Sequence, residues 1–216
     1  DADGLCSFLL LSRSIGKGKG VAIKSFPSLD QSYIRKVHEL NPDYIFVLDK
    51  HSISEEFIQE TLELNIPLVW IDHHDVPVTR IEGVNYYNPV KNERKSSEPV
   101  TYWAYKIAEK KEDLWIAVCG CIGENFLPDF IEDFKKQYPE LLDRNTKNAF
   151  DILYNTEIGK ISRILGFALK DRTSNVVRMI KFLLRVKSPH EILEDTGKNS
   201  LLFKFNQINK RYQKLI

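Results

Sequence analysis

The residues best suited to metal chemistry fall in three short acidic segments. The first is DADG at residues 1–4, the second is the single Asp49, and the third is DHH at residues 72–74. Carboxylates and imidazoles gathered in one place are costly to bury unless cations neutralise them. A mixed set of aspartate and histidine ligands suits Mn²⁺, Mg²⁺ or Co²⁺ better than it suits structural zinc. The pattern therefore predicts a site for divalent cations.

The elements that would position these segments are predicted from hydrophobic pattern. Residues 44–49 and 67–72 are apolar runs that end in aspartate, which is typical of strands buried on both faces. Helical periodicity is found at 29–40 and 54–65, and residues 20–26 have the composition of a further strand. This alternation predicts an α/β fold with a doubly wound parallel sheet. Because ligands bind at the carboxyl edge of such sheets, we expect the acidic segments to meet there.

The second half of the sequence has a different pattern. A helix is predicted from about residue 100 to 110, whereas the apolar, glycine-interrupted segment 114–130 is compatible with a helix or a strand. Strand signals are absent after residue 131, and helices are predicted at 140–154, 157–170, 173–186 and 200–216. We therefore expect a domain at 1–130 and a helical extension at 131–216.

Composition narrows the class of protein. The sequence has 216 residues, of which 43% are hydrophobic, enough for a substantial core. No run approaches the ~20 apolar residues of a membrane span, and no secretory signal is evident, so a cytoplasmic protein with no membrane partner is predicted. The three cysteines lie in apolar runs and are interpreted as buried thiols in preference to a zinc site.

Charge gives little guidance about partners, because the net charge is only +1. Groups of lysine and arginine at 17–19, 91–95 and 210–214 fit either a solvated face or a phosphate track, with a solvated face favoured. The only methionine is Met179, so the sequence does not begin at an initiator methionine. We therefore expect it to be a fragment of a longer protein.

In their order, DADG, a strand-end aspartate and DHH resemble the motif series of the DHH phosphoesterase family over roughly residues 1–130. The helical segments 156–170 and 188–193 are similar to the connecting region of archaeal-type RecJ-like members. The resemblance implies a two-metal phosphodiester hydrolase, namely a RecJ-like single-strand-specific exonuclease or oligonucleotide phosphodiesterase that acts in DNA repair, replication or RNA turnover. It also implies that a DHH-associated substrate-binding domain follows the helical extension.

Roles for single residues are implied by the same resemblance. It assigns Asp1 and Asp3 to one metal each, Asp49 to a bridging position and His73 to a further ligand position, with Mn²⁺ as the expected ion and Mg²⁺ or Co²⁺ as alternatives. The family usually has a metal-binding aspartate where this sequence has Glu124, which would bring its carboxylate to the metal through one more methylene group.

Catalytic and substrate-binding roles are implied for four further residues. Asp72 would orient the metal-binding imidazole, and His74 would contact the scissile phosphate. Ser97 and His51 are candidate substrate contacts by their positions. For Ser97, which precedes a helix, an N-cap is favoured, and for His51 a solvated loop histidine is an equal alternative. Asp129 could replace Glu124 as a ligand, but a surface acid is favoured there.

Two other functions remain open at this point. One is a non-catalytic DHH-type replication scaffold that binds helicase partners, and the other is a small-nucleotide phosphatase or pyrophosphatase. The presence of Asp1, Asp3, Asp49 and His73 favours an enzyme, whereas the glutamate at position 124 favours the scaffold slightly. The expected partners are a single-stranded nucleic acid or oligonucleotide substrate and replication-complex proteins.

Overall fold

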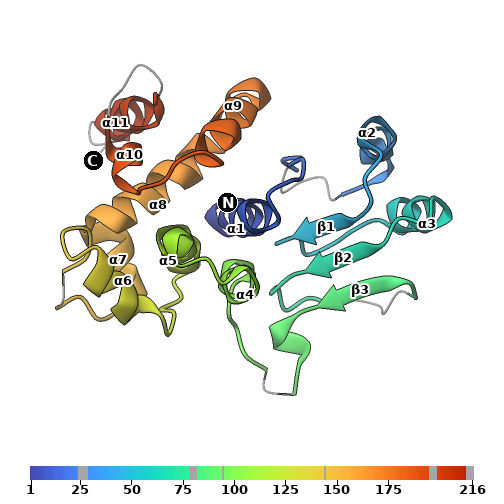
Figure 1. The fold of residues 1–216 in the computed structure, drawn as a ribbon, viewed down its shortest axis with the longest axis horizontal. Helices are drawn as coiled ribbons and strands as arrows, with labels where there is room; N and C mark the ends of the chain where they lie inside the picture. Colours follow the sequence, from blue (N-terminus) through green and yellow to red (C-terminus); the bar gives the residue numbers. More distant parts are fainter. Residues whose placement is uncertain (24–28, 78–81, 94, 144, 195–198, 213–216) are drawn as a thin grey trace. The chain divides into compact units, whose positions relative to one another are not determined.

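The computed structural model describes residues 1–23, 29–77, 82–93, 95–143, 145–194 and 199–212. They form two compact units, each considered by itself. The first, called here the helical unit, comprises Asp1–Gly20 and Thr101–Ile216. The second, the sheet unit, comprises Val21–Val100. Figure 1 shows the elements of both units coloured along the chain.

The described part of the sheet unit contains one three-stranded parallel sheet in the order β1-β2-β3. Its strands are β1 (Ile45–Leu48), β2 (Leu68–Ile71) and β3 (Val84–Tyr87) (Figure 1). The register places Ile45 opposite Leu68, and Leu68 opposite Val84. All strands run in one direction because a helix or a long connection returns the chain between them. The predicted α/β fold with a parallel sheet is confirmed.

One helix before β1 and one between β1 and β2 supply the other side of the sheet unit's core. A short 3-10 turn (Gln31–Tyr33) leads into α2 (Ile34–Leu40), and α3 (Glu55–Glu63) connects β1 to β2. Ser54 caps α3, since its side chain accepts a hydrogen bond of 3.2 Å from the Phe57 N–H. Apolar side chains from these helices, from β1 and β2 and from the segment before the 3-10 turn form a buried cluster: Leu29, Ile34, Val37, Val47, Phe57, Leu68 and Trp70.

Two details of the sheet differ from the sequence prediction. Residues 20–23 of the predicted strand 20–26 are not in a strand, and 24–26 lie outside the described residues. The segment after residue 83 forms β3, which was not predicted as a strand. Its side chains are half-buried or exposed, so it lacks the continuous apolar run that identified β1 and β2.

The helical unit is built around α5 (Leu114–Gly123), whose residues 114–122 are all buried. A helix that is apolar on every face belongs inside a larger core, and the glycine-interrupted segment is therefore a helix here. The other helices are α1 (Ala2–Ile15), α4 (Val100–Ala108), the 3-10 turn η3 (Lys111–Asp113), α6 (Ile131–Gln137), α7 (Ala149–Asn155), α8 (Glu157–Ala168), α9 (Thr173–Leu183), α10 (His190–Leu193) and α11 (Leu201–Tyr212). The helical character expected after residue 131 is confirmed. The predicted helix 140–154 is wrong in its first part, because the described residues of 140–148 form turns and loop before α7 begins at Ala149.

Helix α5 packs against α1 on one side and α8 on another (Figure 1). The predicted boundary near residue 130 remains a prediction, and α5 and α8 contact each other across it. Cys6, Cys119 and Cys121 are buried free thiols, as expected, and burial raises the pKa of each. Within the described chain, every helix is too short or too polar to cross a lipid bilayer.

Replacement of Gly120 by alanine should disturb the contact between α5 and α4. A Cβ atom at Gly120 would lie 2.2 Å from the Thr101 hydroxyl oxygen, so one helix must shift. We expect the free energy of unfolding to fall by about 1–3 kcal/mol in a urea titration. Gly166 in α8 is the matched control, because a Cβ there meets nothing within 4 Å and Gly166→Ala should stabilise slightly. Equal stability of the two variants would contradict this packing.

Candidate metal centre

Asp49 follows β1 directly, at the carboxyl edge of the sheet. Its backbone has a left-handed conformation with φ of 54°, which aspartate tolerates better than most residues. Its N–H donates a hydrogen bond of 2.9 Å to the carbonyl oxygen of Ile71, so the turn is tied to the end of β2. Only 4% of the Asp49 side chain is exposed. The carboxylate is thus held in place at the end of β1.

Two imidazoles from the end of β2 approach the Asp49 carboxylate. The Nε2 atom of His73 lies 3.5 Å from Asp49 Oδ1, and the Nδ1 atom of His74 lies 4.0 Å from the same oxygen. One donor atom from each of the three residues can be chosen so that all lie within 4.8 Å of one another. Donors that bind one cation at about 2 Å each lie at most about 4 Å apart, and the two atom pairs that include Asp49 are within that limit. The three side chains therefore form a candidate cation site.

Asp72 is fully buried beneath the second histidine. Its Oδ1 atom lies 2.7 Å from His74 Nδ1, and its Oδ2 accepts a hydrogen bond of 3.2 Å from the His74 N–H. A carboxylate at Nδ1 keeps the proton on that nitrogen and leaves Nε2 with the lone pair. The resemblance implied that Asp72 orients the metal-binding imidazole, which it assigned to His73. In the structure the imidazole in contact with Asp72 belongs to His74.

Asn88, at the end of β3, supports the same turn and was not identified from the sequence. It is 2% exposed, and its Nδ2 donates hydrogen bonds of 3.0 Å to the His74 carbonyl oxygen and 2.9 Å to the Tyr86 hydroxyl. Its Oδ1 accepts from the Val90 N–H at 2.9 Å, which begins a 3-10 turn (Pro89–Lys91). The sequence feature that could have indicated this role is the pair Asn88-Pro89, because an Asn-Pro dipeptide favours the start of a turn.

Lys50 is a second residue that sequence reasoning missed. It follows Asp49 and is 7% exposed. Its carbonyl oxygen accepts a hydrogen bond of 2.6 Å from the Trp70 indole N–H, which links the chain after β1 to β2. Burial lowers the pKa of Lys50, and the negative charge of Asp49 opposes that shift. The centre thus includes a buried amine beside the carboxylate.

The two predicted substrate contacts lie in loops of the sheet unit. His51 is exposed, and its ring centroid is 5.7 Å from that of His74. Ser97 is exposed in the loop before α4, which starts at Val100, so Pro99 and not Ser97 precedes the helix. The N-cap alternative for this serine is therefore wrong. Its role as a substrate contact stays a prediction.

In the helical unit, Asp1 and Asp3 are positioned by the start of α1. Asp1 is the N-cap, and its Oδ1 accepts a hydrogen bond of 3.2 Å from the Gly4 N–H. Asp3 is fully buried, and its Oδ1 accepts a 2.7 Å hydrogen bond from the Thr101 N–H. The Thr101 hydroxyl donates to the Asp3 carbonyl oxygen at 3.0 Å. Both carboxylates also benefit from the positive end of the helix dipole.

Glu124 lies at the end of α5, beside the first turn of α1. A Cβ atom at Gly123 would be 3.1 Å from the Cβ of Ala2, so the preceding residue of α5 is packed against the helix that carries Asp1 and Asp3. Glu124 itself is exposed at the C-terminal end of α5. Asp129 instead pairs with Lys106 at 2.9 Å on the surface, as favoured for that residue.

The predicted site residues thus form two groups. Asp49, His73 and His74 are brought together in the sheet unit, with Asp72 and His51 beside them. The helical unit contains the other group, which consists of Asp1, Asp3 and Glu124 around the start of α1. That the two groups share a pair of cations remains a proposal.

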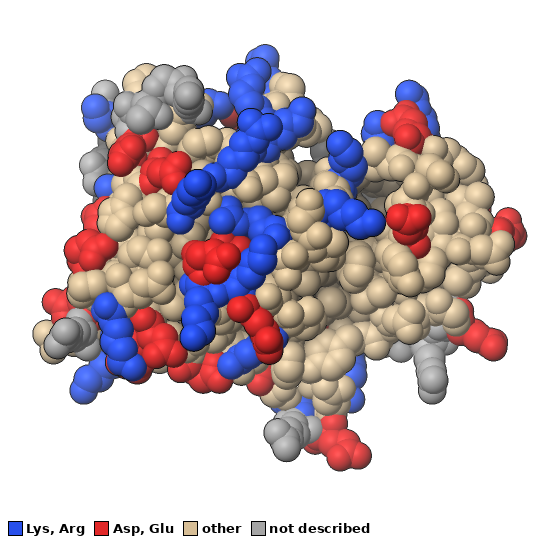
Figure 2. Space-filling model, viewed as in Figure 1, with Lys and Arg blue, Asp and Glu red and all other residues tan. Residues whose placement is uncertain are grey.

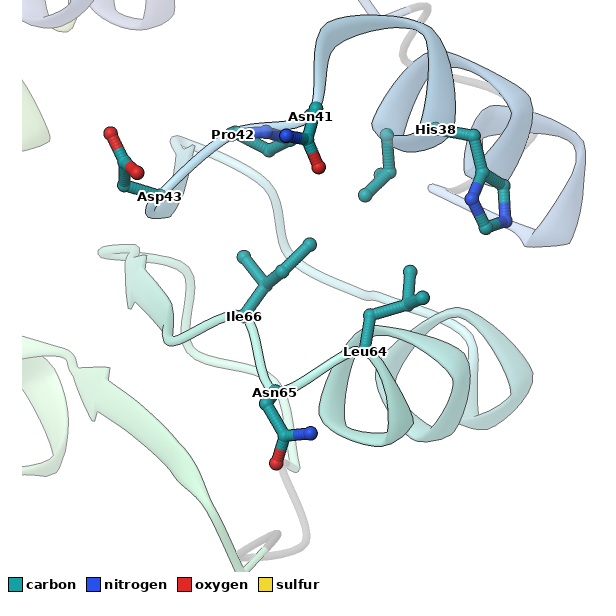
Figure 3. A pocket seen from close by; sticks show the side chains of 8 residues that line it. His38, Asn41, Pro42, Asp43, Leu64, Asn65 and Ile66 are labelled. Carbon is teal, nitrogen blue, oxygen red and sulfur yellow. The ribbon is translucent and has the colours of Figure 1, made fainter.

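A separate pocket of about 380 Å³ lies at the other end of the strands (Figure 3). It is formed where the chain leaves α2 and α3, with Asn41 and Asn65 in left-handed conformations. Asp43 and Ile66 line it just before β1 and β2 begin. It is therefore at the amino edge of the sheet, away from the carboxyl edge that carries the candidate metal ligands.

The fold and the site define an α/β protein with a parallel sheet that carries candidate metal ligands, carboxylate and imidazole, at its carboxyl edge. A family model described as the DHH family, N-terminal domain, matches residues 1–123. The chain belongs to the DHH family. A comparison with curated proteins gave no significant match.

Two solved structures of RecJ share the fold. One is RecJ from Thermus thermophilus in complex with Mn²⁺, with a TM-score of 0.60 and 16% identity over 100% of this chain and 34% of that one. The other is exonuclease RecJ bound to manganese, with a TM-score of 0.59 and 16% identity over 100% of this chain and 60% of that one. The chain therefore spans about a third of the first and 60% of the second.

Proposed function

We propose that the chain is the catalytic part of a two-metal phosphodiester hydrolase, specifically a RecJ-like exonuclease or oligonucleotide phosphodiesterase acting on single strands. The observation that carries this proposal is the Asp49 carboxylate, held between two imidazoles at the carboxyl edge of the sheet. Membership of the DHH family and the fold shared with manganese-bound RecJ support it.

The donor chemistry fits divalent cations, with Mn²⁺ first and Mg²⁺ or Co²⁺ as alternatives. In this proposal Asp49 and His73 hold the ions from the sheet unit. Asp1, Asp3 and Glu124 supply carboxylates from the start of α1 and the end of α5. The geometry of Asp3 supports this assignment. The Thr101 N–H donates to Oδ1 of the buried Asp3 carboxylate, and this hydrogen bond fixes the direction of the other oxygen, Oδ2.

When bound, the cations would neutralise charge on the phosphate and lower the pKa of the attacking water. The side chains of this chain would do the positioning. Asp72 fixes the orientation of the His74 ring, and this imidazole, when protonated on both nitrogens, would donate from Nε2 to the scissile phosphate. His51, next to that ring, and Ser97 would bind flanking parts of the substrate. In-line attack then depends on orientation and on the local electric field.

The deciding experiment is digestion of end-labelled single-stranded DNA and RNA by this chain with Mn²⁺, and with EDTA as the control. We expect shortening of single strands only with the cation, and slower action on duplexes. Mn²⁺ binding without hydrolysis of any phosphodiester would favour the non-catalytic scaffold. Hydrolysis restricted to pyrophosphate or mononucleotides would favour the small-nucleotide alternative.

The biological setting is proposed on the resemblance alone. It would be DNA repair, DNA replication or RNA turnover in the cytoplasm, with replication-complex proteins as partners. Co-purification of tagged protein with replication proteins, compared before and after nuclease treatment, would separate direct partners from those bridged by nucleic acid.

Asp72→Asn should lower the rate of hydrolysis by about 10–100-fold, the usual cost of losing the carboxylate behind a functional imidazole. The amide keeps the shape of the side chain but cannot hold the proton on His74 Nδ1 with the same strength. The measurement is kcat with a labelled oligonucleotide. Asp75→Asn is the control, because Asp75 pairs with Lys91 on the exposed surface. A rate equal to that of the unchanged protein would show that this contact does not matter.

A further inference from the structure

Helix α9 and the residues around it are unusually basic for a chain of net charge +1. Residues 172–187 contain five cationic side chains and no aspartate or glutamate. The cations are Arg172, Arg178, Lys181, Arg185 and Lys187, and all five are exposed. This segment was not among the basic groups identified from the sequence, because its cations are separated by apolar residues.

Three of these cations form a basic stripe along one face of α9 and the turn that follows it. Arg178 and Lys181 lie three residues apart in α9, which places them on the same side of the helix. Arg185 follows four residues later, in a turn joined to the end of α9 by a hydrogen bond of 2.9 Å from its N–H to the Phe182 carbonyl oxygen. Val176, Met179 and Leu183 are buried on the opposite side. Figure 2 shows Lys and Arg side chains in a diagonal band over the position of α9. None of the three stripe residues is paired with a carboxylate in the part of the chain that the structure describes.

A groove of about 470 Å³ runs beside the stripe, between α8, α9 and α11. Arg178 borders it, and Phe167, Phe182 and Phe205 line its apolar part. The rings of Phe167 and Phe205 are 5.6 Å apart in an edge-to-face arrangement. Asp171 is the acid in this lining, and Lys204 pairs with it at 2.5 Å. The rim therefore keeps a net positive charge next to aromatic side chains.

The C-terminal end of α9 is fixed to α1 by Arg13. Its guanidinium binds Asp113 through two contacts of 3.0 and 2.7 Å. It also donates hydrogen bonds of 3.1 and 2.6 Å to the carbonyl oxygens of Leu183 and Val186. Arg13 lies ten residues after Asp3 in α1, a separation of about 15 Å along the helix axis. The basic stripe is thus held at a defined distance from the buried Asp3.

We propose that the exposed face of α9 binds the phosphate backbone of single-stranded nucleic acid, with bases turned towards the adjoining groove. The inference rests on the proposed function and adds a contact surface remote from the metal-binding residues. Arg178 in α9 and Arg185 in the turn after it are separated by seven residues, on the order of 10 Å at the rise of a helix, a span that covers several phosphates of one strand. Guanidinium groups bind phosphate through paired hydrogen bonds, and aromatic rings stack on any base. The surface therefore suits a strand of any sequence.

The test is binding of a fluorescent oligothymidylate of about 12 nucleotides, measured by anisotropy in EDTA over a range of salt concentrations. The variant is Arg178→Gln, Lys181→Gln and Arg185→Gln together. The loss of three phosphate contacts should weaken binding on the order of 100-fold at 0.1 M salt. It should also reduce the salt slope, which is the slope of log binding constant against log salt concentration, by about 2 in magnitude. Glutamine preserves helix propensity, so circular dichroism should be unchanged.

The matched control replaces Lys36, Lys111 and Lys147 by glutamine, which changes net charge by the same amount at exposed sites elsewhere. We expect the control to keep the salt slope of the unchanged protein. Equal weakening in both variants, an unchanged affinity in the α9 variant, or binding of anionic vesicles in preference to the oligonucleotide would overturn the proposal. Since EDTA prevents hydrolysis, failure of the proposed function would appear separately, as binding without Mn²⁺-dependent cleavage.

Discussion

Asp49→Asn should reduce Mn²⁺-dependent hydrolysis of a single-stranded oligonucleotide on the order of 1,000-fold or more. The substitution removes the negative charge that lies between His73 and His74 and leaves the size of the side chain almost unchanged. Asparagine is also the best replacement for the backbone, because φ is 54° at this position and asparagine adopts left-handed conformations readily. Alanine there would add strain to the loss of the ligand.

The measurement combines kcat/KM with calorimetric titration of Mn²⁺, since loss of a ligand must reduce both. Asp43→Asn is the matched control, because Asp43 is an exposed acid that precedes β1 at the opposite edge of the sheet. We expect the control to bind Mn²⁺ and to hydrolyse substrate as the unchanged protein does. Wild-type activity in Asp49→Asn, with the fold intact, would exclude Asp49 as the bridging ligand and remove the main support for the enzyme.

The second large effect is expected at Asp3, where two substitutions separate structure from function. Asp3→Ala leaves the buried Thr101 N–H without its acceptor and should lower the free energy of unfolding by about 1–3 kcal/mol. Asp3→Asn keeps an oxygen in that position and should cost much less stability. Both variants lose the negative charge, so both should lose most of the Mn²⁺-dependent activity.

Thermal or urea unfolding together with the hydrolysis assay distinguishes the possible roles of Asp3. A stable but inactive Asp3→Asn protein supports a role as metal ligand. An Asp3→Asn protein that is both stable and active would instead restrict Asp3 to joining α1 to α4 through Thr101. Thr101→Ser is a useful comparison, because it keeps the N–H and the hydroxyl that contact Asp3.

Local patterns were enough to predict most of the fold. Strands β1 and β2 were identified because a strand buried on both faces must be apolar throughout. Helices α2 and α3 were identified because one apolar stripe repeats with the period of a helix. Strand β3 was missed, since its side chains are only partly buried and its pattern is weak. Segment 114–130 was ambiguous, because burial on all sides removes the periodicity that separates a helix from a strand.

Some features of the candidate site could likewise be predicted from the sequence, and others could not. The positions of Asp49, His73 and His74 at strand ends followed from the sequence, because parallel strands that each end in an acid place those acids at one edge. The sequence did not show which histidine contacts Asp72. His73 and His74 are neighbours of the same residue type, and only the path of the chain after β2 decides which ring reaches the carboxylate. The contact between Asp3 and Thr101 joins residues 98 positions apart, and a local sequence pattern cannot predict such a pair.

The amino-acid sequence alone determined the alternation of strands and helices and the chemical character of the candidate ligands, because both depend on residue type and short-range spacing. Tertiary structure decided which imidazole Asp72 orients, how Asn88 holds the turn that carries it, and how separated cations line up along α9 and the turn after it. These features depend on which faces are buried and which distant segments pack together. Such information arises only when the whole chain folds.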